Sequence, residues 1–394
     1  MSYNKIGDVL VAQGDGTGAL AAYRKGLGIR EALAARDAAN TVWQRDLSVS
    51  HDKIGDVLVA QGDLAGALTA YRKGLGIAEA LAARDAANTE WQRDLSVSYN
   101  KIGDVLVQQG DGTGALAAYR KGLGIAEALA ARDPANTEWQ RDLSVSYEKI
   151  GDVLAQGDGT GALAAYRKGL VIREALAARD AANTVWQRDL SVSHIKIGDV
   201  LVAQGDGAGA LAAYRKGLGI AEALVARDPA NTEWQRDLSV SHNKVGDVLV
   251  AQGDGAGALA AYRKGLGIAE SLAARDAANT EWQRDLSVSH SKIGDVLVAQ
   301  GDGTGALAAY RKGLGIAESL AARDPANAQW QTDVAFSCSN LGRLEHGQTI
   351  DARRGHLLRG RGILARLKEQ GRLPPQQDYI QWFDDRLAEL PSRE

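Results

Sequence analysis

The chain repeats one segment of 48 residues along most of its length, and this repetition constrains its fold more than any other feature. Tryptophans mark the copies at intervals of 48 residues, with one interval of 47: Trp43, Trp91, Trp139, Trp186, Trp234, Trp282 and Trp330. A fixed period of about 20–50 residues is typical of repeat proteins, in which each unit packs on its neighbours. A surface copied this often offers few unique places for an active site, so we do not expect an enzyme.

Composition restricts the class of protein further. The 394 residues carry a net charge of −3, which favours neither a nucleic-acid nor a membrane partner. The single cysteine, Cys338, excludes an intramolecular disulfide and fits a reducing compartment. The apolar runs are too short to cross a bilayer, and the first residues lack a signal-peptide pattern. We therefore expect a cytoplasmic protein without a membrane segment.

The first half of each copy has the pattern of a helix. In the third copy a helical stripe is formed by Trp91, Leu95, Ser98, Ile102 and Leu106. Thr89, followed three residues later by Gln92, matches a capping box and predicts that the helix begins there. Gln109-Gly110-Asp111 should end it, with Gly110 in the left-handed conformation.

The second half of the copy predicts another helix, over about residues 113–132. Its apolar stripe is Leu116, Tyr119, Leu123 and Ala126. Asp111 or Thr113 can cap its start, and Asp133-Pro134 should stop it. Two glycines inside it, Gly122 and Gly124, recur in most copies although each costs about 1 kcal/mol relative to alanine. We expect both to permit close approach between helices.

Each copy is therefore a helix-turn-helix hairpin, and its residues resemble the tetratricopeptide repeat family. The spaced family pattern is matched in the third copy by Tyr99, Ile102-Gly103, Leu106, Gly110, Ala115, Tyr119 and Gly122. The resemblance implies an all-α, right-handed superhelical solenoid whose first helices line a concave groove. The usual family period is about 34 residues, so both helices here are longer. This long-period variety is similar to bacterial arrays attached to caspase-like, TIR or nucleotide-binding signalling domains.

The pattern predicts three regions: seven near-identical repeats over residues 1–330, a degenerate eighth over 331–372 and a C-terminal capping helix over 373–394. The capping helix would carry an apolar stripe of Ile380, Phe383, Leu387 and Leu390. The first copy lacks the turns that precede Met1 in the repeat pattern. Either the chain is a fragment of a longer protein, or its open start packs on another subunit in a homo-oligomer.

The fourth copy is one residue short, because Leu154-Ala155-Gln156 replaces Leu-Val-Ala-Gln. Losing one residue from a helix rotates all later residues of that helix by about 100°. We expect the turn near Gly157 to absorb the loss and to change the local angle between repeats.

Several motifs that could carry chemistry have structural explanations. The glycine-rich turn at residues 110–114 follows a helix and lacks the strand that a phosphate-binding loop requires. Histidines recur at one position, His51, His194, His242 and His290, but packed helices are about 8–10 Å apart, too far for these side chains to share a metal ion. Tyrosine takes the same position in other copies, so we expect these histidines to be packing residues. Cys338 takes the same position in the last copy, so we also expect it to be a packing residue. We expect no metal and no cofactor.

The first helix of each copy also carries polar residues that the family resemblance places in the groove. Lysines recur as Lys5, Lys53, Lys101, Lys149, Lys196, Lys244 and Lys292. Aspartates follow three residues later as Asp8, Asp56, Asp104, Asp152, Asp199, Asp247 and Asp295. At this spacing each lysine should pair with the aspartate of its own helix. The ladder is either a solvated, self-neutralised face or a polar track for an extended peptide.

The residue before each lysine is the most varied position of the repeat: Asn4, Asp52, Asn100, Glu148, Ile195, Asn243 and Ser291. Variation inside a copied unit is where specificity for a partner could enter. Near the C-terminus, Arg354, Arg361 and Lys368 recur every seven residues on one predicted helix face. This basic patch could meet an acidic partner or remain solvated, and since no stacking aromatics are interleaved we do not expect nucleic acid.

These observations favour a non-enzymatic scaffold that binds a protein or peptide in its groove. Two alternatives remain: the sensor or regulatory region of a larger bacterial signalling enzyme, and a self-assembling repeat module. If the tryptophans are buried in the core, replacing Trp139 with alanine should cost about 3–5 kcal/mol.

Overall fold

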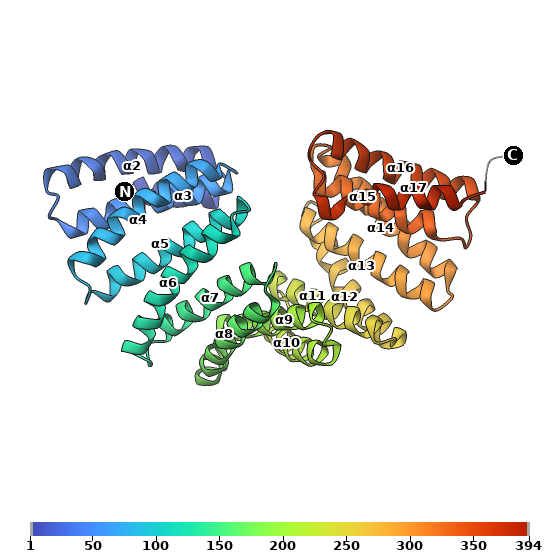
Figure 1. The fold of residues 1–394 in the computed structure, drawn as a ribbon, viewed down its shortest axis with the longest axis horizontal. Helices are drawn as coiled ribbons and strands as arrows, with labels where there is room; N and C mark the ends of the chain where they lie inside the picture. The colour runs from blue at the N-terminus through green and yellow to red at the C-terminus, as the bar shows by residue number, and fades with distance from the viewer. Residues whose placement is uncertain (1–2, 392–394) are drawn as a thin grey trace. The chain divides into compact units, whose positions relative to one another are not determined.

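The computed structural model describes residues 3–391, and every element within that range is helical (Figure 1). Eight antiparallel pairs follow one another along the chain. The first members of the pairs, the A helices, are α1 (Tyr3–Ala12), α3 (Thr41–Ala60), α5 (Thr89–Gln108), α7 (Thr137–Leu154), α9 (Thr184–Ala203), α11 (Thr232–Ala251), α13 (Thr280–Ala299) and α15 (Ala328–Arg343). The second members, the B helices, are α2 (Gly16–Arg36), α4 (Leu64–Arg84), α6 (Gly112–Arg132), α8 (Gly159–Arg179), α10 (Gly207–Arg227), α12 (Gly255–Arg275), α14 (Gly303–Arg323) and α16 (Ile350–Glu369). The short 3₁₀ helix η1 (Pro375–Gln377) and α17 (Ile380–Glu389) complete the fold.

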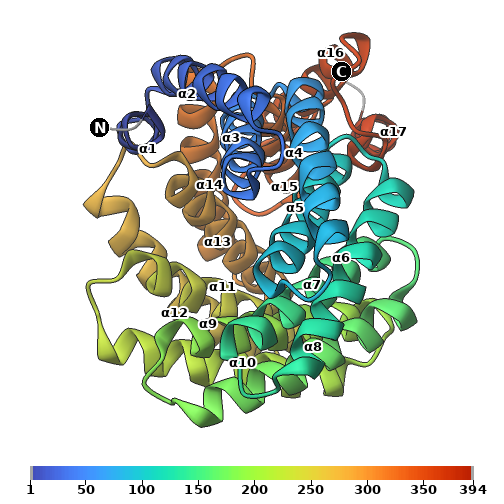
Figure 2. The ribbon, with the colours of Figure 1, turned by 90° about the vertical axis from the view of Figure 1, so that its left-hand side faces the viewer.

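Two compact units make up the chain, Met1–Ser193 and His194–Glu394, and the division falls within α9. In each unit every helix packs on the helices before and after it, which gives the all-α solenoid of paired helices that the repeat predicts (Figure 2). Helix α17 packs on α16, and its side chain Phe383 is fully buried.

The junctions of the third copy show how the repeat sequence sets its helix ends. Helix α5 begins at Thr89 as predicted, but the cap is Asn88, whose side chain accepts a hydrogen bond from the Trp91 N–H. The predicted capping box, with Thr89 as the cap, is therefore wrong, because Asn88 is the N-cap residue and accepts the hydrogen bond from the Trp91 N–H. Gly110 has φ of +80° and closes the helix as expected.

Helix α6 is capped by Asp111, which accepts from the Gly114 N–H, and it ends at Arg132 before Asp133. The proline at position 134 is not required for that stop. The B helix of the second copy ends in the same way at Asp85, where alanine follows.

The two glycines of the B helix have different roles. A Cβ atom on Gly122 would lie 3.1 Å from the Ser96 carbonyl oxygen, so this glycine does permit close approach to α5. A Cβ atom on Gly124 would meet nothing within 4 Å. The packing explanation is therefore right for Gly122 and wrong for Gly124, which faces open space.

The core combines tyrosine and alanine of the B helices with isoleucine, leucine and valine, most of them from the A helices. Tyr119 of α6 is buried against Gly103 of α5, where a Cβ atom would lie 2.3 Å from the tyrosine ring. This contact explains why the copies keep a glycine and a tyrosine 16 residues apart, or 15 in the shortened fourth copy, where Gly151 meets Tyr166. The tryptophans lie outside this core. Trp139 is only half-buried, so the cost expected for a buried tryptophan does not apply to it.

The turn of the fourth copy absorbs the missing residue. Helix α7 has 18 residues against 20 in α5, while α8 keeps the 21 residues of α6. Gly157 does not adopt the positive φ of Gly110, and the Asp158 N–H donates to the Leu154 carbonyl at 2.6 Å. In the third copy, the equivalent Asp111 N–H reaches back to Leu106 at 2.8 Å.

Candidate functional site

One side of the A helices forms a repeated polar and apolar surface, which we call the A face. In α5 it comprises Arg93, Val97, Lys101, Asp104 and Val107, spaced three or four residues apart and so aligned on one side of the helix. The valines are exposed in several copies: Val11, Val49, Val97, Val107, Val202, Val250, Val288 and Val298.

The lysines of the A face bind the aspartate of the preceding repeat. Lys149 of α7 lies 2.6 Å from Asp104 of α5. The same bridge joins Lys53 to Asp8, Lys101 to Asp56, Lys244 to Asp199 and Lys292 to Asp247. The predicted pairing within one helix is wrong for these lysines. Lysine placed N-terminal to the acid is the weaker order for a pair on one helix, and the adjacent helix offers a carboxylate that is already held in place.

A buried tyrosine holds that carboxylate. The Tyr119 hydroxyl donates to Asp104 at 2.6 Å, and the ammonium of Lys149 lies 5.7 Å from the centre of the tyrosine ring. In the first copy, the hydrogen bonds from Lys53 and Tyr23 lower the pKa of Asp8. Burial and the bond to Asp104 raise the pKa of Tyr119. Each Tyr–Asp–Lys cluster therefore joins an A helix, its own B helix and the next A helix.

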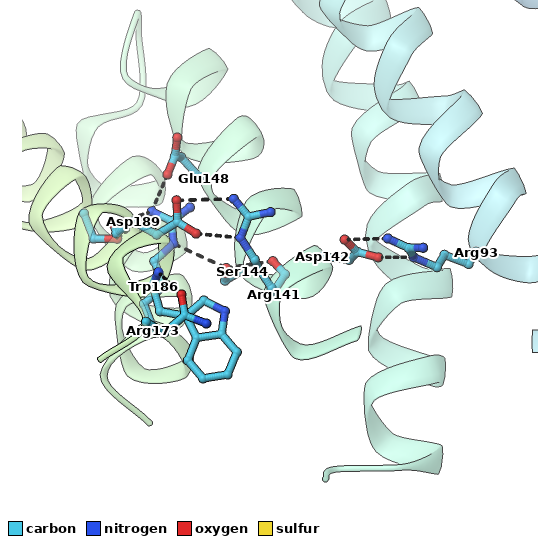
Figure 3. Close-up of polar contacts among 10 residues, drawn as sticks. Arg93, Arg141, Asp142, Ser144, Glu148, Arg173, Trp186 and Asp189 are labelled. Carbon is cyan, nitrogen blue, oxygen red and sulfur yellow. Dashed lines mark hydrogen bonds and ion pairs between the residues drawn. The ribbon is translucent and has the colours of Figure 1, made fainter. Parts of the chain in front are cut away.

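A second bridge joins consecutive A helices near their N-terminal ends. Arg93 of α5 binds Asp142 of α7 through two nitrogens, at 2.5 and 3.5 Å, and Glu138 at 2.8 Å. Figure 3 shows this bridge beside the next one, from Arg141 to Asp189. Equivalent bonds join Arg45 to Asp94, Arg236 to Asp285 and Arg284 to Asp333. The sequence analysis missed these arginine bridges. A signal was present, because an arginine followed directly by an aspartate does not face it on a helix, so each can pair with a residue of another helix.

The variable position before each lysine faces inward. The Oδ1 atoms of Asp52, Asn100 and Asn243 are buried without a hydrogen-bond partner among the described residues. A Cβ atom on Gly122, in the B helix of the same pair, would lie 3.1 Å from Asn100 Oδ1. Burial raises the pKa of Asp52 to about 6. These atoms lie at the contact between the two helices of a pair, and the role in partner recognition that the sequence suggests for this position stays a prediction.

Where an arginine enters the B helix, the variable residue binds it. Arg30 donates to Asn4 at 3.0 Å in the first copy. In the fourth copy Arg173, only 4% exposed, forms an ion pair with Glu148 (Figure 3). Ile195 and Ser291 fill the position in two other copies, and Ser291 donates to the Ser287 carbonyl at 3.2 Å.

A cavity on the A face recurs at equivalent places in the two units. In unit 1 it measures about 470 Å³ and is lined by Asp8, Val11, Gly16, Tyr23, Lys53 and Val57, among others. In unit 2 it measures about 250 Å³ and is lined by the equivalent Asp199, Val202, Gly207, Tyr214, Lys244 and Val248. A third, of about 560 Å³, is lined by Asp295 and Arg343, and there Arg343 binds Asp295 because Asn340 stands at the lysine position of the last repeat.

Comparison with known proteins agrees with this geometry. A family model described as a tetratricopeptide repeat matches residues 1–37, which are the first hairpin of the array. The near-identical copies extend that assignment along the chain. The first hairpin is therefore a tetratricopeptide repeat, and the chain is similar in fold to proteins built from such repeats. Curated protein sequences give no match.

Solved structures show the same fold at low identity. The apo form of RapI is 13% identical, with a TM-score of 0.62 and coverage of 98% of this chain and 97% of that one. A signal transduction ATPase from Pyrococcus horikoshii, described as having a tetratricopeptide repeat sensor, is 11% identical with a TM-score of 0.58. The match spans 97% of this chain and 54% of the ATPase. BtubC from P. vanneervenii is 17% identical, with a TM-score of 0.51, covering 65% and 92% of the two chains.

The basic patch on α16 contacts the C-terminal segment of the same chain. Arg361 binds Asp384 of α17, Lys368 lies 2.7 Å from Asp378, and Arg354 donates to the Pro391 carbonyl. The three cations therefore hold the C-terminal segment on α16. Their heptad spacing, which the sequence showed, marks a docking face within the chain.

The remaining candidates are packing residues. Burial lowers the pKa of His51, His242 and His290. Cys338 is fully buried, and burial raises its pKa to about 11. Among residues 3–391 no group of three or more histidine, cysteine or acidic side chains is arranged to hold a metal ion. No helix in that range is long and apolar enough to cross a membrane.

Proposed function

We propose that the protein is a non-enzymatic interaction scaffold that binds a protein or peptide on its A face. The observation that carries this proposal is the recurrence of one cavity, with the same lining residues, on the A face of both units. The tetratricopeptide-repeat fold is a general protein-interaction fold, which supports the same conclusion. The one thiol of the chain fits a bacterial cytoplasm as the compartment.

The A face has the composition of a binding surface. Exposed valines alternate with charged groups that are fixed by the Tyr–Asp–Lys clusters and the arginine bridges. Rigid polar groups lose little conformational entropy when a ligand binds, and the valines supply apolar area. The repeated bridges also link successive A helices, so a bound segment meets a pre-organised surface.

Peptide display on the full chain tests the proposal. Peptides selected on the wild-type protein should bind at least about tenfold more weakly to a triple variant carrying Val202→Glu, Val250→Glu and Val298→Glu, because each loses an apolar contact and gains a charge. The matched control carries Ile29→Glu and Val171→Glu, which alter equally exposed residues of the B helices. Selected peptides that bind both variants equally would place the binding surface elsewhere.

A second candidate is the sensor region of a larger signalling enzyme. It is favoured by the likeness to the ATPase from Pyrococcus horikoshii, whose description assigns the sensor to tetratricopeptide repeats. Sequencing the gene on both sides of this segment tests it: we expect a nucleotide-binding, caspase-like or TIR domain in the same reading frame. Stop codons directly flanking the segment would exclude this candidate.

A further inference from the structure

Helix α17 covers the face of α16 on which an internal B helix carries the next A helix (Figure 1). Two glycines establish the register. A Cβ atom on Gly122 of α6 would lie 3.1 Å from the Ser96 carbonyl oxygen, and one on Gly360 of α16 would lie 3.2 Å from the Ala335 carbonyl oxygen. Ser96 and Ala335 both stand five residues after the tryptophan of their copies. Positions of α6 and α16 can therefore be compared one by one.

This face is apolar in α6 and basic in α16. In α6 it forms an apolar cluster with the next A helix that includes Leu123, Ala126, Ala130, Leu143 and Tyr147. In the same register α16 has Arg361, Leu364 and Lys368. The apolar side of an A helix would bury these two cations without a carboxylate, which is costly. The face of α16 therefore selects an acidic helix over another repeat.

Helix α17 meets this requirement with one aromatic anchor and two acids. Phe383 is fully buried, and a Cβ atom on Gly360 would lie 2.6 Å from its ring. Beside the anchor Asp384 binds Arg361, and Asp378 binds Lys368 at 2.7 Å. An apolar helix face with an aromatic residue and acids on both sides of it is thus the chemistry that α16 recognises.

Helix α17 depends on this docking for its own stability. It has 10 residues, and the side chain of its N-cap residue, Tyr379, makes no capping hydrogen bond. A helix shorter than about 12–15 residues is marginal in water on its own. Its ion pairs are partly exposed, since the side chains of Arg361 and Lys368 are 41% and 62% exposed, so salt screens them. Undocking and unfolding of α17 are therefore coupled, and undocking opens the face of α16.

The match between α17 and the basic patch is incomplete. Arg354, Arg361 and Lys368 follow one another at seven-residue intervals and lie on one side of α16. Among the described residues, Arg354 receives the Pro391 carbonyl and no carboxylate, because α17 ends at Glu389. A helix that continued further and carried an acid at the position of Pro391 would supply a carboxylate to all three cations. Such a helix would bind more tightly than α17 does.

We propose that this face of α16 is a second protein-binding site, which takes an acidic amphipathic helix of a partner protein in exchange for α17. The tethered α17 competes at an effective concentration in the range of about 1 mM, so only a helix that matches the patch better displaces it. The site lies on a B helix of unit 2, apart from the A face, and the inference goes beyond the proposed function.

Fluorescence anisotropy with the full chain and a labelled peptide of residues 374–391 measures the exchange. In the variant Phe383→Ala the anchor of α17 is lost, so the face is open. We expect the peptide to bind this variant at least about tenfold more tightly than the wild type, in which α17 competes. The change Pro391→Glu in the peptide gives Arg354 a carboxylate and should tighten binding at least about threefold.

Charge reversal tests whether the face recognises acid. Asp384→Lys in the peptide should weaken binding to the Phe383→Ala chain about tenfold, and adding Arg361→Glu to that chain should restore it. The matched control is Asp385→Lys in the peptide, since Asp385 bonds to Gln381 of its own helix. This control should bind as the parent peptide does.

Hydrogen exchange on the isotopically labelled wild-type chain shows whether a bound helix displaces α17. At a saturating concentration of the Pro391→Glu peptide, the amides of α17 should exchange at least about tenfold faster, while those of α15 keep their rates. If α17 keeps its protection while the peptide is bound, the peptide lies elsewhere and the inference is wrong.

Two further outcomes would overturn the inference: equal binding of the peptide to the wild type and to Phe383→Ala, and equal binding of the parent and Asp384→Lys peptides. If Phe383→Ala unfolds, Asp384→Lys in the chain loosens α17 without removing its buried side chain and carries the test. The A-face variant with Val202→Glu, Val250→Glu and Val298→Glu should bind the peptide as the wild type does, so failure of one proposal is distinguishable from failure of the other.

Discussion

The third and fourth pairs, α5–α6 and α7–α8, differ at few positions but join their helices by different chemistry. In the third, Ser96 donates to the Gly122 carbonyl at 2.9 Å, and Ala126 fills the space beside it. In the fourth, Arg173 takes the alanine position. Ser144 donates to the Arg141 carbonyl at 2.8 Å, and its oxygen accepts from Arg173 at 3.3 Å (Figure 3).

The arginine is also tied to the next A helix. It donates to the Asp189 carbonyl at 3.1 Å and to the Ser193 hydroxyl at 2.7 Å, besides its ion pair with Glu148. A buried guanidinium requires acceptors for its donors, and two helices, α7 and α9, supply them here. Meanwhile the outward cluster is unchanged, since Tyr166 still donates to Asp152 at 2.6 Å. The tyrosine–aspartate contact is thus the same in both copies, whereas the fourth copy differs inside the array at Arg173 and lacks the A-face valine that follows Leu106 in the third.

Removing the acid from the fourth pair should have the largest effect on stability. Glu148→Ala leaves Arg173 buried without its carboxylate, and breaking a buried pair in this way costs about 3–5 kcal/mol. Urea unfolding measures the loss. The same truncation in the third pair, Asn100→Ala, removes an oxygen that has no partner there and should cost less than about 1 kcal/mol.

A double variant can replace the buried ion pair of the fourth pair of helices by the residues of the third. The double variant Glu148→Asn with Arg173→Ala imports the residues of α5 and α6, and replacing a buried ion pair by well-packed residues is often neutral or stabilising. We therefore expect stability equal to or above the wild type. A double variant as unstable as Glu148→Ala would show that Arg173 is needed for packing.

The second pair contains a carboxylate at the same position without an arginine. Asp52 faces Lys101, Asp56 and Asp94, and burial is the main reason that its pKa rises to about 6. Because the folded pKa lies above the unfolded value, the folded state binds the extra proton between pH 4 and 6, and stability falls as the pH rises through that range. Asp52→Asn should therefore stabilise by about 2–3 kcal/mol at pH 8 and by little at pH 4. Equal effects at both values would contradict the role of charge.

The sequence was sufficient to predict where the helices lie, and it was insufficient to predict which side chains contact one another. Helical stripes, the left-handed Gly110 and the cap at Asp111 depend on neighbouring residues, so they could be predicted locally. The partner of Lys149 could not, because two aspartates lie within its reach and only the stacking of repeats brings Asp104 close. The inward direction of Asn100 likewise depends on a glycine in another helix.

The two glycines of α6 should respond in opposite directions. Gly122→Ala places a Cβ atom 3.1 Å from the Ser96 carbonyl and should destabilise by about 1–3 kcal/mol, the range for overpacking. Gly124→Ala meets open space and should stabilise by up to about 1 kcal/mol through helix propensity. The fourth pair supports the second expectation, since Val171 occupies that position and is exposed. Thermal unfolding of both variants measures the difference, and a loss of stability in Gly124→Ala would indicate an unseen contact.

The smallest expected effect separates the two pairing schemes for Lys149. In a double-mutant cycle, Lys149→Met with Asp104→Asn should show a coupling of about 0.5–1 kcal/mol, since the pair is partly exposed and its carboxylate is fixed by Tyr119. Lys149→Met with Asp152→Asn, the pair on one helix, should show coupling near zero. Raising the salt concentration should reduce the first coupling, because exposed charges are screened. If the second cycle gave the larger coupling, the lysine would pair along its own helix, and only the Arg93 bridge would join the A helices of the third and fourth pairs.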